Sequence, residues 1–190
     1  MDNIPIHLIV TMTENGTIAD QGSIPWLIPG EQKHFKDHTL GAAVLMGRKT
    51  WESLSHAPLP GRLNIVLSHQ ANFEAHGAIV VTSHTEAVDV AMAAELEQPV
   101  LWIMGGAEVL NHAQWMADKA YVTVLHDHYD GDTKFTTKRD GKILANVVEE
   151  ADVVFVSNER TSGAVVSATK KLRYSRVIIG FGPNDKMKQS

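Results

Sequence analysis

Cysteine is absent from this 190-residue chain. Its absence excludes disulfide bonds, thiolate metal sites and cysteine nucleophiles, and it fits a reducing compartment. Long apolar runs are also absent. The N-terminal IPIHLIV is short, has no preceding positive residues and contains His7, so it favours a strand over a signal peptide. We therefore expect a soluble cytoplasmic protein without a membrane anchor.

Positive charge is scarce relative to negative charge. Lys and Arg total 17 against 22 Asp and Glu, which gives a formal net charge of -5, and no basic block or stripe is present. This balance argues against a nucleic-acid or membrane-surface partner. The apolar fraction of 44% allows a substantial core. We expect one domain over residues 1–182 and a polar tail, 183–190, that frays.

Several common catalytic signatures are missing. Gly105-Gly106 does not make G-x-G-x-x-G, so a Rossmann domain is not supported, and no G-x-S-x-G elbow indicates a serine hydrolase. His34 and His38 have the i, i+4 spacing of helical metal ligands, but HFKDH lacks the glutamate of H-E-x-x-H and no third ligand can be named. We interpret this pair, and the His126-x-His128 pair, as polar histidines and expect no metal.

What is present is an alternation of short aliphatic segments with helix-like ones. Apolar runs without polar alternation are typical of buried parallel strands, and strands alternating with helices predict an α/β fold. The sheet should be central and mostly parallel, with helices on both faces and an antiparallel C-terminal edge hairpin from residue 147 onward. The predicted strands are 6–12, 42–47, 64–68, 78–81, 100–105 and 120–126, and the predicted helices are 30–39, 49–54, 83–96 and 107–116.

One carboxylate lies on an otherwise apolar helix face. In PWLIPGEQKHF, the spacing places Ile28, Glu31 and Phe35 on the same side of the helix. A buried unpaired charge is costly, so this carboxylate either has a partner or belongs to a functional site. A first-turn carboxylate also favours the helix dipole and can stay half solvated. This segment alone leaves both interpretations open.

Two strand-to-helix turns carry residues suited to anions. In LMGRKTWES, Arg48, Lys49 and Thr50 follow a buried strand and open a helix, where N–H groups and two cations favour an anion ligand. The alternative is a solvated first turn without a ligand, but Arg48 and Lys49 would then be unfavourable at the positive end of the helix dipole. Gly105 and Gly106 permit close backbone approach, although a tight turn alone explains such a pair. The long loop at 13–26 follows the first strand and could serve as a lid.

Taken in order, eight motifs resemble the dihydrofolate reductase family: NGTIA, IPW, GEQKHFK, LMGRKTWESL, PLPGRLNIVLS, IMGGAEV, YVTVL and GDTKF. The resemblance extends from Ile6 to Phe135, and the C-terminal part matches only in its strand-rich character. It implies reduction of 7,8-dihydrofolate to 5,6,7,8-tetrahydrofolate by NADPH, with hydride transfer to C6, in one-carbon metabolism. It also implies a cytoplasmic monomer that is an antifolate target.

The resemblance implies a role for each matching residue. Glu31 would bond the pterin and support protonation at N5, Thr123 would orient Glu31, and Arg62 would pair with the α-carboxylate of the glutamate tail. The Gly105–Gly106 pair would be joined by a cis peptide bond beside the nicotinamide. The expected catalytic residues are Glu31, Trp26 and Thr123; the substrate-binding residues are Ile9, Glu31, Phe35, Arg62 and Thr123; the cofactor-binding residues are Thr11, Ile18, Ala19, Arg48, Lys49, Thr50, Ser68, His69, Gly105, Gly106, Ala107, Glu108 and Val109.

Some positions depart from the commonest pattern of that family. Ala19 stands where glycine is usual, His69 where a small hydroxyl residue is common, and Leu110 where tyrosine is frequent. Glu31 replaces the aspartate of most bacterial members. These departures leave antifolate sensitivity open and do not change the expected activity.

Two alternatives to dihydrofolate reduction remain at this stage. A riboflavin-pathway type reductase shares the fold and NADPH, but its substrate has neither a pterin nor a glutamate tail, so Glu31, Phe35 and Arg62 argue against it. A non-catalytic pterin- or nucleotide-binding module fits the sequence as well. Oxidation of NADPH in the presence of dihydrofolate would separate the three.

Overall fold

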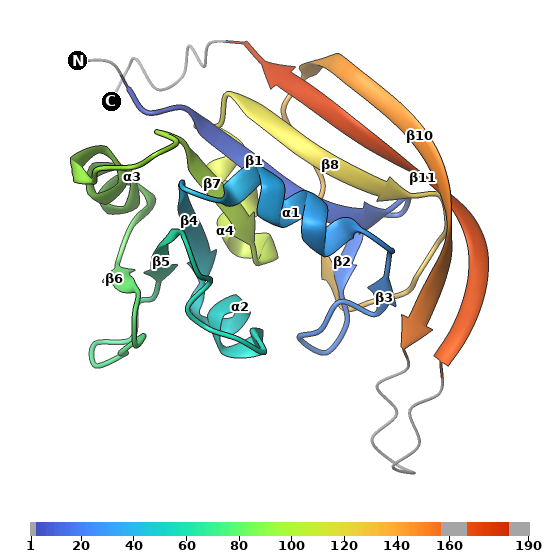
Figure 1. The fold of residues 1–190 in the computed structure, drawn as a ribbon, viewed down its shortest axis with the longest axis horizontal. Helices are drawn as coiled ribbons and strands as arrows, with labels where there is room; N and C mark the ends of the chain where they lie inside the picture. Colours follow the sequence, from blue (N-terminus) through green and yellow to red (C-terminus); the bar gives the residue numbers. More distant parts are fainter. Residues whose placement is uncertain (1–2, 157–166, 183–190) are drawn as a thin grey trace.

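The computed structural model describes residues 3–156 and 167–182, so the predicted tail at 183–190 lies outside the described residues. Four helices and eleven strands are placed (Figure 1). The helices are α1 Glu31–Thr39, α2 Arg48–Ser53, α3 His84–Ala93 and α4 Ala107–Ala113. The strands are β1 Ile6–Thr13, β2 Thr17–Ala19, β3 Trp26–Leu27, β4 Ala43–Gly47, β5 Leu63–Leu67, β6 Ile79–Val81, β7 Leu101–Gly105, β8 Lys119–Leu125, β9 Thr133–Lys134, β10 Gly141–Val156 and β11 Ser167–Phe181.

The main sheet confirms the predicted fold class. Its order is β3-β10-β11-β8-β1-β7-β4-β5-β6, and a small second sheet pairs β2 with β9. The run from β8 to β6 is parallel, whereas β11 pairs antiparallel with both β8 and β10. The C-terminal hairpin therefore extends the parallel sheet at one edge, as the strand-rich C-terminal sequence predicted.

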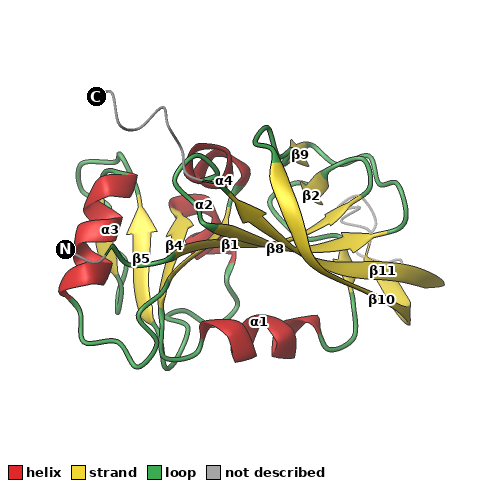
Figure 2. Ribbon diagram, turned by 90° about the horizontal axis from the view of Figure 1, so that it is seen from above, coloured by secondary structure: helices red, strands yellow, loops and turns green. Residues whose placement is uncertain are grey.

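Helices cover both faces of the sheet, which explains the continuous apolar strands. Leu8 and Val10 of β1 pack in one core cluster with residues of α3 and α4, whereas Ile9 between them packs in the opposite cluster with Phe35 of α1. Figure 2 shows α1 on one side of the sheet and α4 on the other. Successive residues of a central strand are thus both buried, so no polar alternation appears in the sequence.

Local sequence sets where two of the helices begin. Gly30 precedes α1 with φ = 81°, a left-handed conformation that favours glycine. At α3, Ser83 Oγ accepts a hydrogen bond from the Glu86 N–H at 3.1 Å, as the capping-box spacing predicts. In a standard capping box the Glu86 carboxylate would accept a hydrogen bond from the backbone N–H of Ser83. Here it accepts instead from N and Oγ1 of Thr82, at 2.7 and 2.9 Å. None of the described helices combines the length and apolar character needed to cross a membrane.

The structure differs from the sequence prediction mainly where strands are short or exposed. β10 begins at Gly141 rather than at 147, and most of its first half is exposed because it lies at the sheet edge. The loop predicted at 13–26 contains β2, which pairs antiparallel with β9. An exposed edge strand and a strand of two or three residues carry no burial periodicity, so the sequence pattern could not indicate them.

His7 of β1 is a buried histidine whose protonation the fold opposes. Its side chain is 9% exposed, and its ring lies 4.9 Å from the Trp102 ring and 5.5 Å from the Tyr121 ring. His7 Nδ1 has no hydrogen-bond partner within the described part of the chain. Burial, assisted by the nearby Lys119 charge, lowers the pKa of His7 from 6.5 to about 4.

This burial predicts a pH-dependent stability. As the pH falls below 6.5, His7 takes up a proton in the unfolded chain, whereas in the folded chain it stays neutral until about pH 4. The free energy of unfolding should therefore decrease as the pH is lowered between these values. The full loss is at most about 3 kcal/mol. His7→Phe keeps the aromatic contacts and removes the titration. The free energy of unfolding, measured with urea across this pH window, should depend less steeply on pH in the variant than in the parent. An equal dependence on pH in the two proteins would contradict the prediction.

Candidate active site

Three neighbouring strands place a row of polar side chains on one face of the sheet. Thr11 of β1 is in register with Thr123 of β8, and Thr123 is in register with Arg176 of β11. Residues opposite one another on paired strands point to the same face. Thr11, Thr123 and Arg176 therefore form a row across β1, β8 and β11.

Glu31 of α1 reaches both ends of this row. Thr11 Oγ1 donates to Glu31 Oε1 at 2.6 Å, and Arg176 Nη2 donates to Glu31 Oε2 at 3.5 Å. The Glu31 side chain is 21% exposed, so a ligand can still reach it. The carboxylate thus has partners in the protein, and its position in the first turn of α1 is only part of its role.

The hydroxyl that holds Glu31 differs from the expected one. The resemblance implied Thr123, yet Thr11 makes the contact, although Thr11 had been expected on the cofactor side. Both threonines lie in register on the same face, and Glu31 bonds β1 on one side and β11 on the other. The carboxylate therefore spans β8, where Thr123 is 3% exposed. A contact between Thr123 and Glu31 in the ligand-bound protein stays a prediction.

The apolar and aromatic residues predicted for the site are buried or half-buried. Ile9 and Phe35 belong to one core cluster, with Phe35 half-buried. Trp26 is 2% exposed, and its indole Nε1 is buried without a hydrogen-bond partner among the described residues. A buried N–H donor usually has a partner, so Trp26 Nε1 is suited to a ligand or an ordered water.

Arg62 lies at the opposite end of α1. Its Nε donates to the Pro60 carbonyl at 3.1 Å and its Nη1 donates to Thr39 Oγ1 at 3.2 Å. The guanidinium carbon is 5.6 Å from the centre of the Phe35 ring, and partial burial lowers the pKa of Arg62. Because an α-helix rises 1.5 Å per residue, Glu31 and Thr39 are about 12 Å apart along α1. The arrangement suits an elongated ligand with hydrogen-bond donors at one end and a carboxylate at the other.

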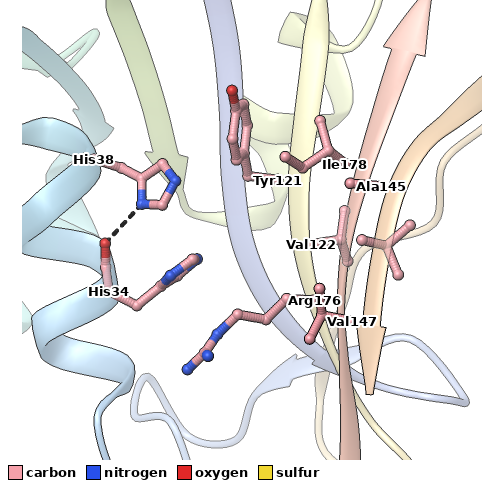
Figure 3. A pocket seen from close by; sticks show the side chains of 9 residues that line it. His34, His38, Tyr121, Val122, Ala145, Val147, Arg176 and Ile178 are labelled. Atoms are coloured by element: carbon pink, nitrogen blue, oxygen red, sulfur yellow. Dashed lines mark hydrogen bonds between the residues drawn. The ribbon is translucent and has the colours of Figure 1, made fainter. Parts of the chain in front are cut away.

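A pocket lies between α1 and the strands that carry Tyr121 and Arg176. Its volume is about 210 Å³, and Figure 3 shows His34 and His38 on one side with Tyr121 and Arg176 on the sheet side. His38 Nδ1 lies 2.9 Å from the His34 carbonyl oxygen, and the two rings are 4.3 Å apart. Arg176 lines this pocket and also contacts Glu31.

The residues predicted for a cofactor gather at the carboxyl ends of parallel strands. Arg48 follows β4, Ser68 follows β5 and Gly106 follows β7. β5, β4 and β7 are consecutive neighbours in the sheet. Their carboxyl ends meet at one edge, the place where open α/β sheets bind ligands.

The turns that start α2 and α4 approach closely at this edge. A Cβ on Gly47 would lie 3.1 Å from Val109 Cγ2, and one on Gly106 would lie 3.4 Å from Thr50 Oγ1. The Gly105–Gly106 peptide bond is cis, as the resemblance implied. The φ of 144° at Gly105 favours glycine. The backbone of the turn before α2 and that of the turn before α4 therefore lie next to each other.

Arg48 is already paired in this structure. Its Nη1 donates to both carboxylate oxygens of Glu52 at 2.8 Å, one turn along α2. Lys49 and His69 are exposed, whereas Ser68 is buried. A phosphate bound here must therefore compete with Glu52 for Arg48. The anion site predicted from Arg48 and Lys49 did not include this ion pair.

The remaining predicted cofactor residues lie on two elements. Ile18 is buried and Ala19 half-buried on β2, and the first turn of α4 contains Ala107, Glu108 and Val109. The Val109 carbonyl oxygen is 3.2 Å from Nε2 of His84, a contact that the sequence did not indicate. Leu110, one of the departures from the family pattern, is fully buried in the core.

Comparisons with known proteins agree with this geometry. A family model described as dihydrofolate reductase matches residues 5–153. The chain is 42% identical over 132 residues to the dihydrofolate reductase of Neisseria gonorrhoeae, covering 70% of this chain and 79% of that one. It is 39% identical over 132 residues to the dihydrofolate reductase of Buchnera aphidicola subsp. Baizongia pistaciae, covering 70% and 77%.

A solved structure agrees over almost the whole length. Dihydrofolate reductase from Enterococcus faecalis, complexed with NADP(H) and RAB-propyl, resembles this structure with a TM-score of 0.76 at 26% sequence identity, over 95% of this chain and 98% of that one. The match includes the C-terminal hairpin, for which the sequence motifs gave no detail. By its sequence and its fold, this chain belongs to the dihydrofolate reductase family of NADPH-dependent oxidoreductases.

Proposed function

We propose that this protein reduces 7,8-dihydrofolate to 5,6,7,8-tetrahydrofolate with NADPH. The observation that carries the proposal is the line formed along α1 by Glu31, Phe35 and Arg62. Dihydrofolate has complementary parts: a pterin edge with N–H donors, an aromatic linker and an α-carboxylate. A riboflavin-pathway substrate lacks the parts that Phe35 and Arg62 would bind.

Glu31 is the residue proposed to support protonation of the substrate. Its carboxylate would accept hydrogen bonds from the pterin amino group and ring N–H, and it would support protonation of the substrate at N5. NADPH, when bound, supplies the hydride that adds to C6. Ile9 and Phe35 would pack on the pterin and exclude water, which strengthens the electrostatic effect of the carboxylate. Trp26, whose indole N–H has no partner among the described residues, would hold a polar group or a water near the ring.

The cofactor would bind along the edge formed by the ends of β4, β5 and β7. Arg48, Lys49 and Ser68 provide donors for the 2′-phosphate and pyrophosphate, and the Gly105–Gly106 turn would lie beside the nicotinamide. The contact between the turns that start α2 and α4 supports one continuous site for a long dinucleotide. We also propose, on the resemblance to the family, that the protein acts in the cytoplasm as a monomer.

Arg48 should distinguish NADPH from NADH. Arg48→Leu removes a charge-assisted contact to the extra phosphate, a contact typically worth about 1.5–3 kcal/mol, so the KM for NADPH should rise roughly tenfold or more. The KM for NADH should stay nearly unchanged. Steady-state kinetics with both cofactors measures the difference.

Glu52→Gln provides the matched control for Arg48. It removes the carboxylate that pairs with Arg48 and leaves the guanidinium in place. The KM for NADPH should fall or stay the same in this variant. Equal losses for NADPH and NADH in Arg48→Leu would refute the 2′-phosphate assignment.

The proposed activity is tested by following NADPH oxidation with dihydrofolate as the substrate. Steady, dihydrofolate-dependent oxidation supports the proposal. Turnover of a ribosylamino-pyrimidine instead would identify a riboflavin-pathway type reductase. Binding of a pterin or of NADPH without turnover would identify a binding module.

A further inference from the structure

Arg176 lies between two carboxylates, one in the proposed substrate site and one on the edge strand. Its Nη2 is 3.5 Å from Glu31 Oε2, and its Nη1 donates to Glu149 Oε2 of β10. The Arg176 side chain is only 23% exposed, whereas that of Glu149 is 39% exposed. Figure 3 shows Arg176 extending from β11 toward α1, beside His34.

The arginine has few other ways to satisfy its charge. Its guanidinium carbon is 5.1 Å from the centre of the Tyr174 ring, and its Nε is buried without a hydrogen-bond partner within residues 3–156 and 167–182. Moving away from Glu31 would leave the partly buried guanidinium with one carboxylate partner, Glu149, in place of two, which is unfavourable. Arg176 should therefore stay beside Glu31 when a ligand binds.

A ligand at Glu31 must share the carboxylate with resident partners. Thr11 donates to Oε1 and Arg176 to Oε2, and each carboxylate oxygen can accept a second hydrogen bond. A neutral ring with two N–H donors can use these remaining positions without adding charge. A cationic ring with the same donor edge brings a second positive charge close to Arg176, and like charges at such distances repel.

Apart from the carboxylates of Glu31 and Glu149, two titratable groups lie close to Arg176, namely His34 and Tyr174, and neither adds a charge. Burial, followed by repulsion from His38 and Arg176, lowers the pKa of His34, so His34 is neutral near neutral pH. Burial raises the pKa of Tyr174, which keeps its hydroxyl neutral as well. Among the described residues, Arg176 is the one lysine or arginine within ion-pair distance of Glu31. The charge that a ligand meets beside Glu31 is set by Arg176, and Glu149 offsets part of it from the opposite side.

We propose that Arg176 is a specificity-determining residue that shifts the preference of the site toward a neutral pteridine and away from a cationic ring with the same donor edge. Glu149 weakens this preference because it pairs with the other side of the guanidinium. The inference rests on the proposed function in one respect, namely that Glu31 is the group that binds the heterocycle.

The test compares two pteridines that differ in charge when bound. One is 2-amino-4-oxo-6-methylpteridine, a weakly basic ring that stays neutral, and the other is 2,4-diamino-6-methylpteridine, whose second amino group makes the ring basic enough to take up a proton beside a carboxylate. Dissociation constants near neutral pH are measured for the parent protein and for Arg176→Gln and Glu149→Gln. The ratio of the two constants reports the preference and cancels general changes in the site.

The two variants should change this ratio in opposite directions. Arg176→Gln removes the repelling charge, so the ratio should move about tenfold toward the cationic ring, the lower end of the effect of a nearby charge. Glu149→Gln removes the negative charge that offsets part of the Arg176 charge, so the ratio should move toward the neutral ring. This change should be about two- to threefold, because interactions of a more exposed carboxylate are weaker. Arg173→Gln, which removes an exposed charge from the same strand, should leave the ratio unchanged.

If Arg176 had a purely structural role, its loss would weaken the binding of both pteridines alike and leave their ratio unchanged. Ratios that move in the same direction, or do not move, overturn the inference, and Glu149→Gln alone still tests its sign if Arg176→Gln does not fold. Glu31→Gln separates this outcome from failure of the proposed function. If Glu31→Gln weakens both pteridines while Arg176→Gln leaves the ratio fixed, only the role of Arg176 is wrong. If Glu31→Gln weakens neither, the proposed function fails, and the inference fails with it.

Discussion

Glu31→Gln is expected to lower the rate of dihydrofolate reduction near neutral pH about a hundred- to ten-thousand-fold, the usual cost of losing general acid–base assistance. Glutamine keeps the size of the side chain and can still accept the Thr11 hydrogen bond. It cannot carry the negative charge that favours a proton on the substrate. The rate should recover partly as the pH falls, because solvent then protonates more of the substrate directly.

The competing explanation for Glu31 makes a different prediction. If the carboxylate only stabilised the start of α1, its loss would cost from a few tenths to about 1 kcal/mol of stability and would spare turnover. Glu86→Gln is the matched control, because Glu86 is a first-turn carboxylate of α3. Glu86→Gln should lower stability slightly and leave kcat unchanged. Equal kcat values in Glu31→Gln and the parent would remove Glu31 from the proposed chemistry.

Arg62→Ala is expected to weaken dihydrofolate binding by roughly tenfold to a hundredfold, since a charge-assisted hydrogen bond contributes about 1.5–3 kcal/mol. The guanidinium is oriented by the Pro60 carbonyl and Thr39 Oγ1, and it lies beside Phe35. Its partner would be the α-carboxylate of the glutamate tail. A pterin that lacks this tail should bind the variant as tightly as it binds the parent protein.

Arg62→Lys refines the same measurement. Lysine keeps the positive charge but lacks the planar fork that binds a carboxylate through two parallel hydrogen bonds. Its affinity for dihydrofolate should fall between those of the parent and Arg62→Ala. If Arg62→Ala weakens the tailless pterin as much as dihydrofolate, the arginine does not bind the tail.

The parallel part of the fold could be predicted because burial leaves a clear pattern in the sequence. Strands covered on both faces, such as β4 and β7, are continuous apolar runs, and their predicted limits are close to the observed ones. The first half of β10 has no such pattern because its side chains are mostly exposed at the sheet edge. The pairing of β2 with β9 depends on segments far apart in the chain, which local patterns do not report.

The candidate site was predictable to the extent that it depends on local motifs. Glu31 and Phe35 were indicated by helix spacing, and the pairing of Arg48 with Glu52 could have been found from their i, i+4 separation. The contacts of Glu31 with Thr11 and Arg176 depend instead on the register of three strands. Arg176 is one charged residue among several in a strand-rich segment, so nothing local distinguishes it.

Single-turnover hydride transfer, followed across pH in the parent protein and in Glu31→Gln, tests the central claim most directly. A deuterium at C4 of the NADPH nicotinamide should slow the observed step, which identifies it as hydride transfer. The parent is expected to transfer hydride rapidly at neutral pH, whereas Glu31→Gln should be slow there and accelerate as the pH falls. Superimposable rates and pH profiles for the two proteins would contradict the account, because Glu31 would then have no part in protonating the substrate.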